Sequence, residues 1–228
     1  MSMHSGSPCI PSIRSAHSGA RSAPPTHALA GPVDMMGAPM AFPRNGEIHG
    51  EGEPAAYVYK VISGTVRTSK LLADGRRQIG AFYLPGDVFG LETGDEHAFS
   101  AEAITASEIL VVRRDALLAL AARDSGVARA LWTLTGRELA RVQDHLMLLV
   151  KTAQERVAGF LLEMAARRPA GDTVELPMSR QDIADYLGLT IETVSRTLTS
   201  LANEAAIELS NSRRIVLRDR PALRGMDA

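Results

Sequence analysis

Residues 179–203 read SRQDIADYLGLTIETVSRTLTSLAN, and this stretch decides how the C-terminal part of the chain folds. Ser179 and Asp182 have the spacing of a capping box, which predicts the start of a helix whose apolar residues follow at helical intervals. Gly188 suits the tight turn that ends this helix, and Thr190 is a cap for a second helix directly after it. Two helices joined in this way, with small residues where they touch, predict a helix-turn-helix.

The second helix, over 191–204, carries Glu192, Ser195 and Arg196 at positions i, i+3 and i+4, so these side chains are neighbours on one exposed face. An arginine can donate two hydrogen bonds to guanine, and a carboxylate can accept one from cytosine. A carboxylate would repel phosphates, which favours base reading over mere backbone binding. We therefore predict that these three residues read base pairs in the major groove of DNA. A solvent-facing ion pair between Glu192 and Arg196 is the open alternative.

Residues 207–218, IELSNSRRIVLR, read as a β-hairpin with its turn at 210–212, which is the pattern of a wing beside a helix-turn-helix. We expect its basic edge and the N-termini of the two helices to contact phosphates, which positions a protein on DNA without reading sequence. The predicted phosphate contacts are Arg180, Thr190, Thr193, Arg213 and Arg214. The alternative that these arginines are ordinary solvated charges stays open.

The region 51–121 contains short β-rich runs separated by turns, which predict a small β-barrel or sandwich. Asp74-Gly75 between two apolar runs is a strong hairpin signal. Gly64 interrupts the first run, as a bend or bulge would require.

The region 122–150 changes to helical periodicity, and a second helix is expected over about 152–167. The apolar residues of the first helix form a stripe that a barrel with its own core does not need, so we predict pairing with a second copy of the chain. The predicted dimer residues are Leu131, Leu134, Val142, Leu146 and Leu149. Glu138 stands where a heptad would place an apolar residue, and it keeps open the alternative that the stripe packs only on its own barrel.

Residues 1–50 are rich in Pro, Ser, Gly and His without any apolar period, which predicts a disordered tail. The single cysteine, Cys9, lies there and cannot form an internal disulfide or supply the ligands of a metal cluster. We expect no metal and no cofactor.

The whole chain has 228 residues and a net charge of −1, so any positive surface for DNA must be local. Its length predicts two folded domains. No run of about 18 apolar residues and no secretory core are present, so we expect no membrane contact and a cytoplasmic location.

The recognition segment 191–196, the turns at Gly64 and Asp74-Gly75, the segment GDVFG at 86–90 and the long helix together resemble the Crp/Fnr superfamily over about residues 50–220. The stretch FGLETGDEHAFSAEA at 89–103 is especially similar to FixK-type regulators. The resemblance implies an α+β fold. Its parts are an N-terminal cyclic-nucleotide-binding-like β-barrel (jelly roll), a long dimerisation helix and a winged helix-turn-helix over 151–228.

The Glu-x-x-Ser-Arg pattern is similar to the Fnr and FixK branch, with Ile191 where the cyclic-AMP receptor branch has an arginine. The resemblance implies a transcription regulator, not an enzyme, that activates genes of microaerobic growth or nitrogen fixation. It also implies that the protein binds a TTGA-type inverted repeat as a homodimer and that this homodimer contacts RNA polymerase. Fnr-type oxygen sensors need four cysteines, so no iron–sulfur cluster is implied.

A small β-barrel is also compatible with two other function classes. A barrel that senses a small molecule is one, but Phe99 stands where nucleotide-binding members have the arginine that neutralises the phosphate. Haem through His97 stays possible, although a surface role for this residue is expected. A metal-dependent cupin enzyme is the other, and it would need several histidines, whereas His97 is the only one between Tyr57 and Asp115.

Overall fold

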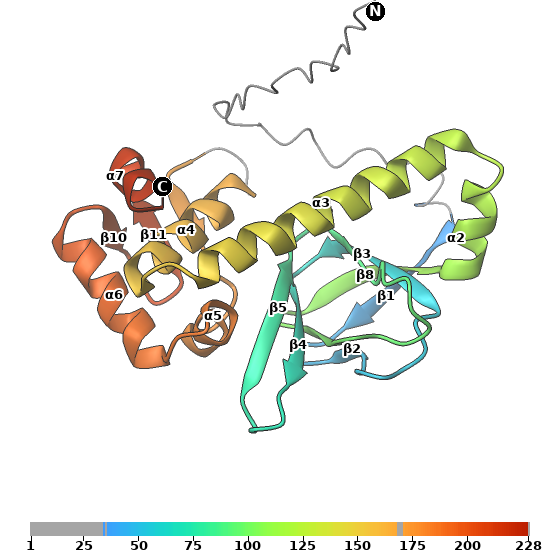
Figure 1. Ribbon diagram of the computed structural model, residues 1–228, viewed down its shortest axis with the longest axis horizontal. Helices are drawn as coiled ribbons and strands as arrows, with labels where there is room; N and C mark the ends of the chain where they lie inside the picture. Colours follow the sequence, from blue (N-terminus) through green and yellow to red (C-terminus); the bar gives the residue numbers. More distant parts are fainter. Residues whose placement is uncertain (1–33, 35, 168–170, 228) are drawn as a thin grey trace, which may run out of the picture.

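The computed structural model describes residue 34 and residues 36–167 and 171–227. Helix α3 (Ser125–Leu149) runs along one side of an N-terminal β-barrel and leads to a C-terminal domain of helices and three short strands (Figure 1). The sequence-based prediction of an α+β fold with a barrel, a long helix and a winged helix-turn-helix is confirmed.

The barrel is built from two four-stranded antiparallel sheets, with strand orders β1-β8-β3-β6 and β2-β7-β4-β5. Its interior is filled by apolar side chains, among which Val61, Val66 and Ile109 have no exposed surface. The strands are β1 (Ala38–Phe42), β2 (Glu47–His49), β3 (Tyr57–Ser63), β4 (Val66–Leu71), β5 (Arg77–Tyr83), β6 (Val88–Phe89), β7 (Ser100–Ala103) and β8 (Ser107–Arg113).

Two glycines make the barrel turns that the sequence indicated. Gly75 has φ +81° in the turn between β4 and β5, a conformation that L-residues rarely adopt. Gly64 has φ +87° between β3 and β4, and a Cβ there would lie 2.1 Å from Ser107 Oγ. The close approach of these two segments therefore requires glycine at position 64.

The expectation of a disordered tail extending to residue 50 is wrong for residues 38–49, which contain β1, β2 and the turn that joins them. Strand β1 lies at the edge of its sheet beside β8, where Pro39 is tolerated because an edge strand can leave one side without ladder hydrogen bonds. All five residues of β1 are apolar although most of them are exposed, so no alternation of apolar and polar residues marked this strand in the sequence. The predicted disorder of residues 1–33 and 35, and Cys9 with it, lies outside the described residues.

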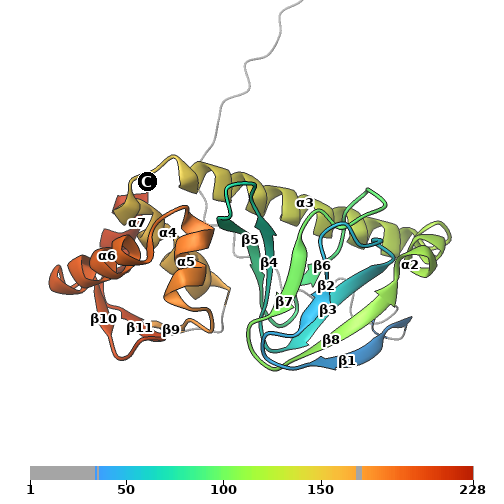
Figure 2. The same ribbon diagram turned by 90° about the horizontal axis from the view of Figure 1, so that it is seen from below.

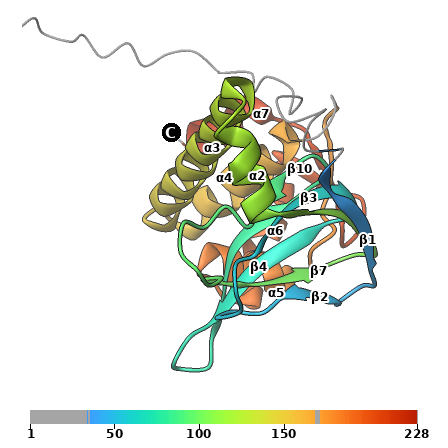
Figure 3. The same cartoon turned by 90° about the vertical axis from the view of Figure 1, so that its right-hand side faces the viewer.

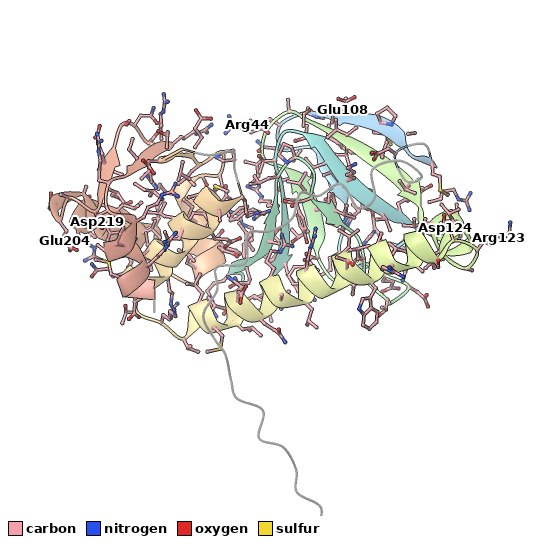
Figure 4. The ribbon with its side chains drawn as sticks, turned by 90° about the horizontal axis from the view of Figure 1, so that it is seen from above. Arg44, Glu108, Arg123, Asp124, Glu204 and Asp219 are labelled. Atoms are coloured by element: carbon pink, nitrogen blue, oxygen red, sulfur yellow. The ribbon has the colours of Figure 1, made fainter. Side chains whose placement is uncertain are left out.

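Helix α2 (Arg114–Ala121) follows the barrel, and α3 then crosses the molecule toward the C-terminal domain (Figures 1 and 3). Asp124 caps α3, because its carboxylate accepts hydrogen bonds from the backbone N–H groups of Gly126 at 2.7 Å and Val127 at 3.2 Å. Asp124 lies at one end of the molecule, whereas Glu204 and Asp219 lie at the other (Figure 4).

The C-terminal domain places α4, α5 and α6 around a core closed by a three-stranded sheet of order β10-β11-β9 (Figure 2). Its elements are α4 (Ala153–Ala166), β9 (Thr173–Glu175), α5 (Arg180–Leu187), α6 (Ile191–Asn203), β10 (Ile207–Leu209), β11 (Arg214–Leu217) and α7 (Arg220–Asp227). In the part of the chain that the structure describes, none of the helices has the length and apolar character to span a membrane.

Candidate nucleic-acid interface

The helix-turn-helix forms as the local sequence signals indicated. Ser179 and Asp182 make a complete capping box at the start of α5, with each side chain bonded to the backbone N–H of the other residue. Gly188 ends α5 in the left-handed conformation, at φ +62°. The Thr190 hydroxyl then accepts from the N–H of Thr193 at 3.2 Å and caps α6.

The buried face of α6 determines which residues remain available for DNA. Val194, Leu198 and Leu201 are buried in the core of the domain. Glu192, Ser195 and Arg196 are therefore turned outward, and all three are exposed near the N-terminal end of the helix. The structure thus brings the three predicted base-reading residues together on one open face.

The electrostatics at this end of α6 hold Glu192 in its charged form. Its own backbone N–H, the Thr190 hydroxyl and the nearby Arg196 lower the pKa of its carboxyl below the ordinary value. The Arg196 Nε donates to the backbone carbonyl of Glu192 at 3.4 Å. Both side chains keep charged ends at the surface, where a carboxylate can accept and a guanidinium can donate hydrogen bonds.

The predicted phosphate contacts differ in their accessibility. Thr190 is exposed and Thr193 is half-buried, and their hydroxyl oxygens lie 3.1 Å apart at the N-terminus of α6. Arg180 is also half-buried, and desolvation lowers its pKa. Its Nη1 atom is buried and has no hydrogen-bond partner among the described residues. Arg180 is therefore less open to solvent than the sequence led us to expect.

The wing is the hairpin of β10 and β11. Its turn is held by Asn211, whose side-chain oxygen accepts from the N–H groups of Arg213 and Arg214, each at 2.8 Å. Both arginines are exposed at the tip. The hairpin is joined to the domain by β9, which pairs with β11.

Comparison with known proteins agrees with this arrangement. A Crp-like helix-turn-helix domain matches residues 155–226, and a cyclic nucleotide-binding domain matches residues 39–124. The nitrogen fixation regulation protein FixK of Azorhizobium caulinodans is 54% identical over 202 residues, covering 86% of this chain and 82% of that protein. The chain belongs to the Crp/Fnr superfamily.

Other relatives place it in the FixK-like branch of that superfamily. FixK of Rhizobium meliloti is 43% identical and covers 85% of this chain and 93% of that protein. The solved structure of FixK2 from Bradyrhizobium japonicum superposes with a TM-score of 0.81 at 52% identity, covering 84% of this chain and 98% of that one. The chain is thus a transcription regulator of the Crp/Fnr type, as its sequence indicated.

In this Crp/Fnr regulator the long helix divides its apolar residues between two sides. Leu131 and Leu134 pack against the chain's own apolar cluster around Val127 and Ala130, as the alternative to dimer contacts had proposed. Val142 and Leu146 are exposed at 47% and 57% of their surfaces. Leu149 is half-buried.

Sequence reasoning missed two members of the exposed stripe on α3. Trp132 is 81% exposed and Leu139 is 58% exposed, which is unusual for side chains of this size. Leu139 precedes Val142 by three residues and Leu146 by seven, so all three share one face. The seven-residue spacing from Trp132 to Leu139 to Leu146 is present in the sequence. Leu131 and Leu134 lie on an adjoining apolar face of the helix and were assigned to the stripe instead.

A cavity of about 520 Å³ lies between the barrel and α3. It is lined mainly by apolar residues, and Phe99 is among them, as are Leu139 and Leu146 of α3. Phe99 therefore places an aromatic ring on the cavity wall, and neither lysine nor arginine is among the described residues that line it. The resemblance to nucleotide-binding barrels would require a cation at this position to neutralise a phosphate.

The expectation that His97 is a surface residue is wrong, because only 2% of it is exposed. Its ring stacks on that of His49 with centroids 3.5 Å apart, and His49 belongs to the segment expected to be a tail. His97 Nδ1 lies 3.4 Å from Glu92 Oε1. Among the described residues, no group of three or more His, Cys, Asp or Glu side chains is arranged to hold a metal ion.

Proposed function

We propose that this regulator activates transcription as a homodimer bound to a TTGA-type inverted repeat. The observation that carries the proposal is the open Glu-x-x-Ser-Arg face of α6, with Glu192, Ser195 and Arg196 exposed together. Arg196 would bind guanine and Glu192 would accept from cytosine in each half-site. Arg213 and Arg214 of the wing would hold the adjacent phosphates, together with Arg180, Thr190 and Thr193.

The exposed stripe of α3 supports the dimer. Leu139, Val142 and Leu146 form an apolar face that no part of the described chain covers fully. Pairing two such faces would bury them and relate the two recognition helices by a twofold axis. The two recognition helices, called readers below, would then enter successive major grooves about 34–36 Å apart, and this symmetry requires a palindromic site.

The names of the relatives support the biological setting, and the family resemblance suggests the partner protein. Two proteins that share 54% and 43% identity with this chain are named nitrogen fixation regulation proteins. We infer control of nitrogen fixation or microaerobic genes, contact with RNA polymerase at the promoter, and action in the cytoplasm. Control by the abundance of the protein suits a barrel whose cavity presents Phe99 instead of a cation.

The experiment that tests this proposal is selection of bound sequences from random DNA with the full-length protein. We expect enrichment of a TTGA-type inverted repeat with one preferred separation of its halves. Enrichment of a single half-site would contradict the dimer. Enrichment of no motif at all would contradict sequence-specific binding.

A second candidate is an effector-sensing regulator, favoured by the 520 Å³ cavity, because ligand sites commonly occupy 300–1,000 Å³. The effectors to examine are cyclic nucleotides and haem. Calorimetric titration with cyclic AMP and cyclic GMP and optical titration with haemin would decide. Micromolar binding of any of them that changes DNA affinity would replace the ligand-free proposal.

A further inference from the structure

The barrel grips the first helix of the helix-turn-helix through the β4–β5 hairpin. Arg67 of β4 and Arg77 of β5 reach Asp182 and Asp185 of α5, more than a hundred residues further along the chain. Strand β5 and α5 lie side by side in both ribbon views (Figures 1 and 2).

Asp182 is the centre of this contact, and only 3% of it is exposed. Its Oδ1 accepts from Arg67 Nη1 at 2.8 Å and from Arg77 Nη2 at 2.7 Å. Its Oδ2 accepts from the Ser179 N–H at 2.9 Å and from the Ser179 hydroxyl at 2.8 Å. One carboxylate therefore caps α5 and binds both barrel arginines at once.

The charge of Asp182 is stabilised despite its surroundings. Burial alone would raise the pKa of this carboxyl, but the Ser179 hydrogen bonds and the charges of Arg67 and Arg77 bring it below the ordinary value. Arg67 is itself fixed from the other side, because its Nη2 donates to Glu102 of β7 at 2.8 Å. The carboxylate thus stays charged and paired at neutral pH.

A second pair widens the grip. Arg77 Nε and Nη2 both reach Asp185 Oδ2, at 2.8 and 2.7 Å. The side chain of Gln78 donates to the backbone carbonyl of Tyr186 at 3.4 Å. Because each guanidinium is planar, its hydrogen bonds to the carboxylates fix the orientation of α5 on the hairpin as well as the distance between them.

Apolar packing lies directly beneath these polar contacts. Phe82 of β5 is 1% exposed, and its ring centroid is 5.1 Å from that of Tyr186 in α5 and 6.2 Å from that of Phe160 in α4. Ile79 of β5 belongs to the same core cluster. Strand β5 therefore contributes to the core of the C-terminal domain as well as to the barrel.

The grip leaves the reading face free. Strand β5 packs on α5, whereas Glu192, Ser195 and Arg196 of α6 remain exposed. Helix α5 in turn packs directly against α6. The orientation of α5 on the barrel hairpin therefore sets the orientation of the recognition helix relative to the rest of the protomer.

We propose that Arg67 and Arg77 are positioning residues for DNA binding: they fix each recognition helix relative to the barrel and α3, and so fix the distance between the two readers of a dimer. This inference rests on the proposed function, since it needs two readers on an inverted repeat. Two rigidly held readers accept one separation of half-sites. Readers released from the hairpin accept neighbouring separations as well.

The test measures DNA binding by full-length Arg77→Gln, Asp185→Asn and the double variant. Inverted repeats whose half-sites differ in separation by one base pair at a time are compared with a single half-site. The Arg76→Gln variant is the matched control, because Arg76 is 77% exposed at the hairpin tip and pairs with Asp74.

We expect each single variant to bind the preferred repeat about 5- to 150-fold more weakly, the range of ordinary coupling energies, and to lose the preference for one separation. The double variant is expected to be no worse than the weaker single variant, because both substitutions break the same contact. Arg77→Lys is expected to keep part of the preference. Binding to a single half-site and its salt dependence stay as in the wild type, which also reports that the reader is folded.

A spacing preference that Arg77→Gln leaves intact would overturn the inference, even if the variant melts at a lower temperature. Loss of single half-site binding in Asp185→Asn and Arg77→Gln alike would also overturn it, because the contact would then support folding instead of placement. A wild-type protein without any preferred separation would instead contradict the proposed dimer, and the inference would fall with it.

Discussion

Arg196 extends from an exposed turn of α6, and its Nε contacts the backbone carbonyl of Glu192 at 3.4 Å. That contact is long and leaves the guanidinium free to rearrange toward a base. The Ser179 capping box, Gly188 and the apolar spacing of α6 are all local signals, and for this reason the sequence could place Glu192, Ser195 and Arg196 on one exposed face. Their role in base reading stays a prediction.

We expect Arg196→Ala to weaken binding to the specific site by about 1–3 kcal/mol per half-site and to relax the preference for guanine at one position. The reason is that a bidentate contact to guanine would be lost. Binding to specific and random DNA, measured across a salt series, checks this.

Arg213→Ala is the matched control, because this exposed wing residue is proposed to bind phosphate. It should weaken specific and random DNA alike and reduce the salt slope by about one. If Arg196→Ala behaved in the same way as Arg213→Ala, Arg196 would be a phosphate contact and the proposed reading would be wrong.

His49 is a residue whose role no local signal indicated, since its partners come from other strands. It is 3% exposed, with its ring centroid 3.5 Å from that of His97 and 5.3 Å from that of Tyr59. Burial, and then the neighbouring His97, lower the pKa of His49 from 6.5 to about 4. A polar residue in a Pro-rich segment gave no reason to expect a place in a barrel.

The barrel is expected to lose stability in mild acid. The unfolded chain binds a proton at His49 near pH 6.5, whereas the folded chain resists it until about pH 4. The contribution of His49 is therefore present above pH 6.5 and is lost as the pH falls to about 4, by roughly 3 kcal/mol at 1.36 kcal/mol per pKa unit. Thermal melting between pH 7 and 4 measures it.

The His49→Phe variant is the comparison for this prediction, because it keeps an aromatic ring beside Tyr59 and His97. Its melting temperature should fall less steeply with acid than that of the wild type. Parallel pH profiles for the two proteins would show that His49 does not cause the acid sensitivity.

At the scale of elements, the two halves of helix α3 differ in what their apolar residues contact. Its N-terminal half packs on its own protomer through Val127, Ala130, Leu131 and Leu134. Its C-terminal half exposes an apolar face. The sequence predicted this helix over 122–150, within three residues of its observed start and one of its observed end. The period alone could not tell which side of the apolar stripe meets the barrel, because two adjoining faces of α3 are both apolar.

Leu146→Glu is expected to give a folded monomer that binds an inverted repeat weakly. Leu146 is 57% exposed in the protomer, so the substitution leaves the internal core intact while placing a charge in the proposed dimer face. Ala140→Glu is the matched control, because Ala140 is exposed on another side of α3. Sedimentation analysis measures the mass of each variant. A dimeric Leu146→Glu protein would move the interface elsewhere.

Strands β1 and β2, unlike helix α3, could not be predicted from the sequence. Strand β1 is mostly exposed and contains Pro39, so the usual pattern of a strand was absent although its pairing with β8 is regular. Strand β2 has only three residues, which is too short to show an alternation. The ion pairs of Arg67 and Arg77 were equally hidden, since their partners lie 105 to 115 residues away in the sequence. Such contacts depend on how elements are arranged and leave no local trace.

For the whole molecule, the barrel and the C-terminal domain share one apolar core, which should couple their unfolding. Ile79 and Phe82 of the barrel lie in the same cluster as the apolar residues of α4, α5 and α6. The net charge of −1 leaves little overall attraction to DNA, so we expect affinity to depend on how accurately the few proposed base-reading and phosphate-binding groups are placed.

We expect the wild-type protein to unfold in a single calorimetric transition, because barrel and reader share this core. Phe82→Ala removes a ring that is 1% exposed, should cost about 3–5 kcal/mol and should separate the melting of the two domains. Phe99→Ala, at a half-buried ring that lines the cavity, is the control and should keep one transition. Two transitions in the wild type would show that the domains are not coupled.

The double use of Asp182 also limits how this protein can be recombined. A chimera that joins residues 151–228 to a foreign barrel would leave the cap of α5 with a buried carboxylate but without its two arginines. Such a chimera should bind an inverted repeat weakly until the new barrel is given arginines at the positions of Arg67 and Arg77. We therefore expect the DNA-binding domain to function only together with one strand pair of its barrel, so that specificity should be exchanged between relatives more safely within α6 than by moving the whole domain.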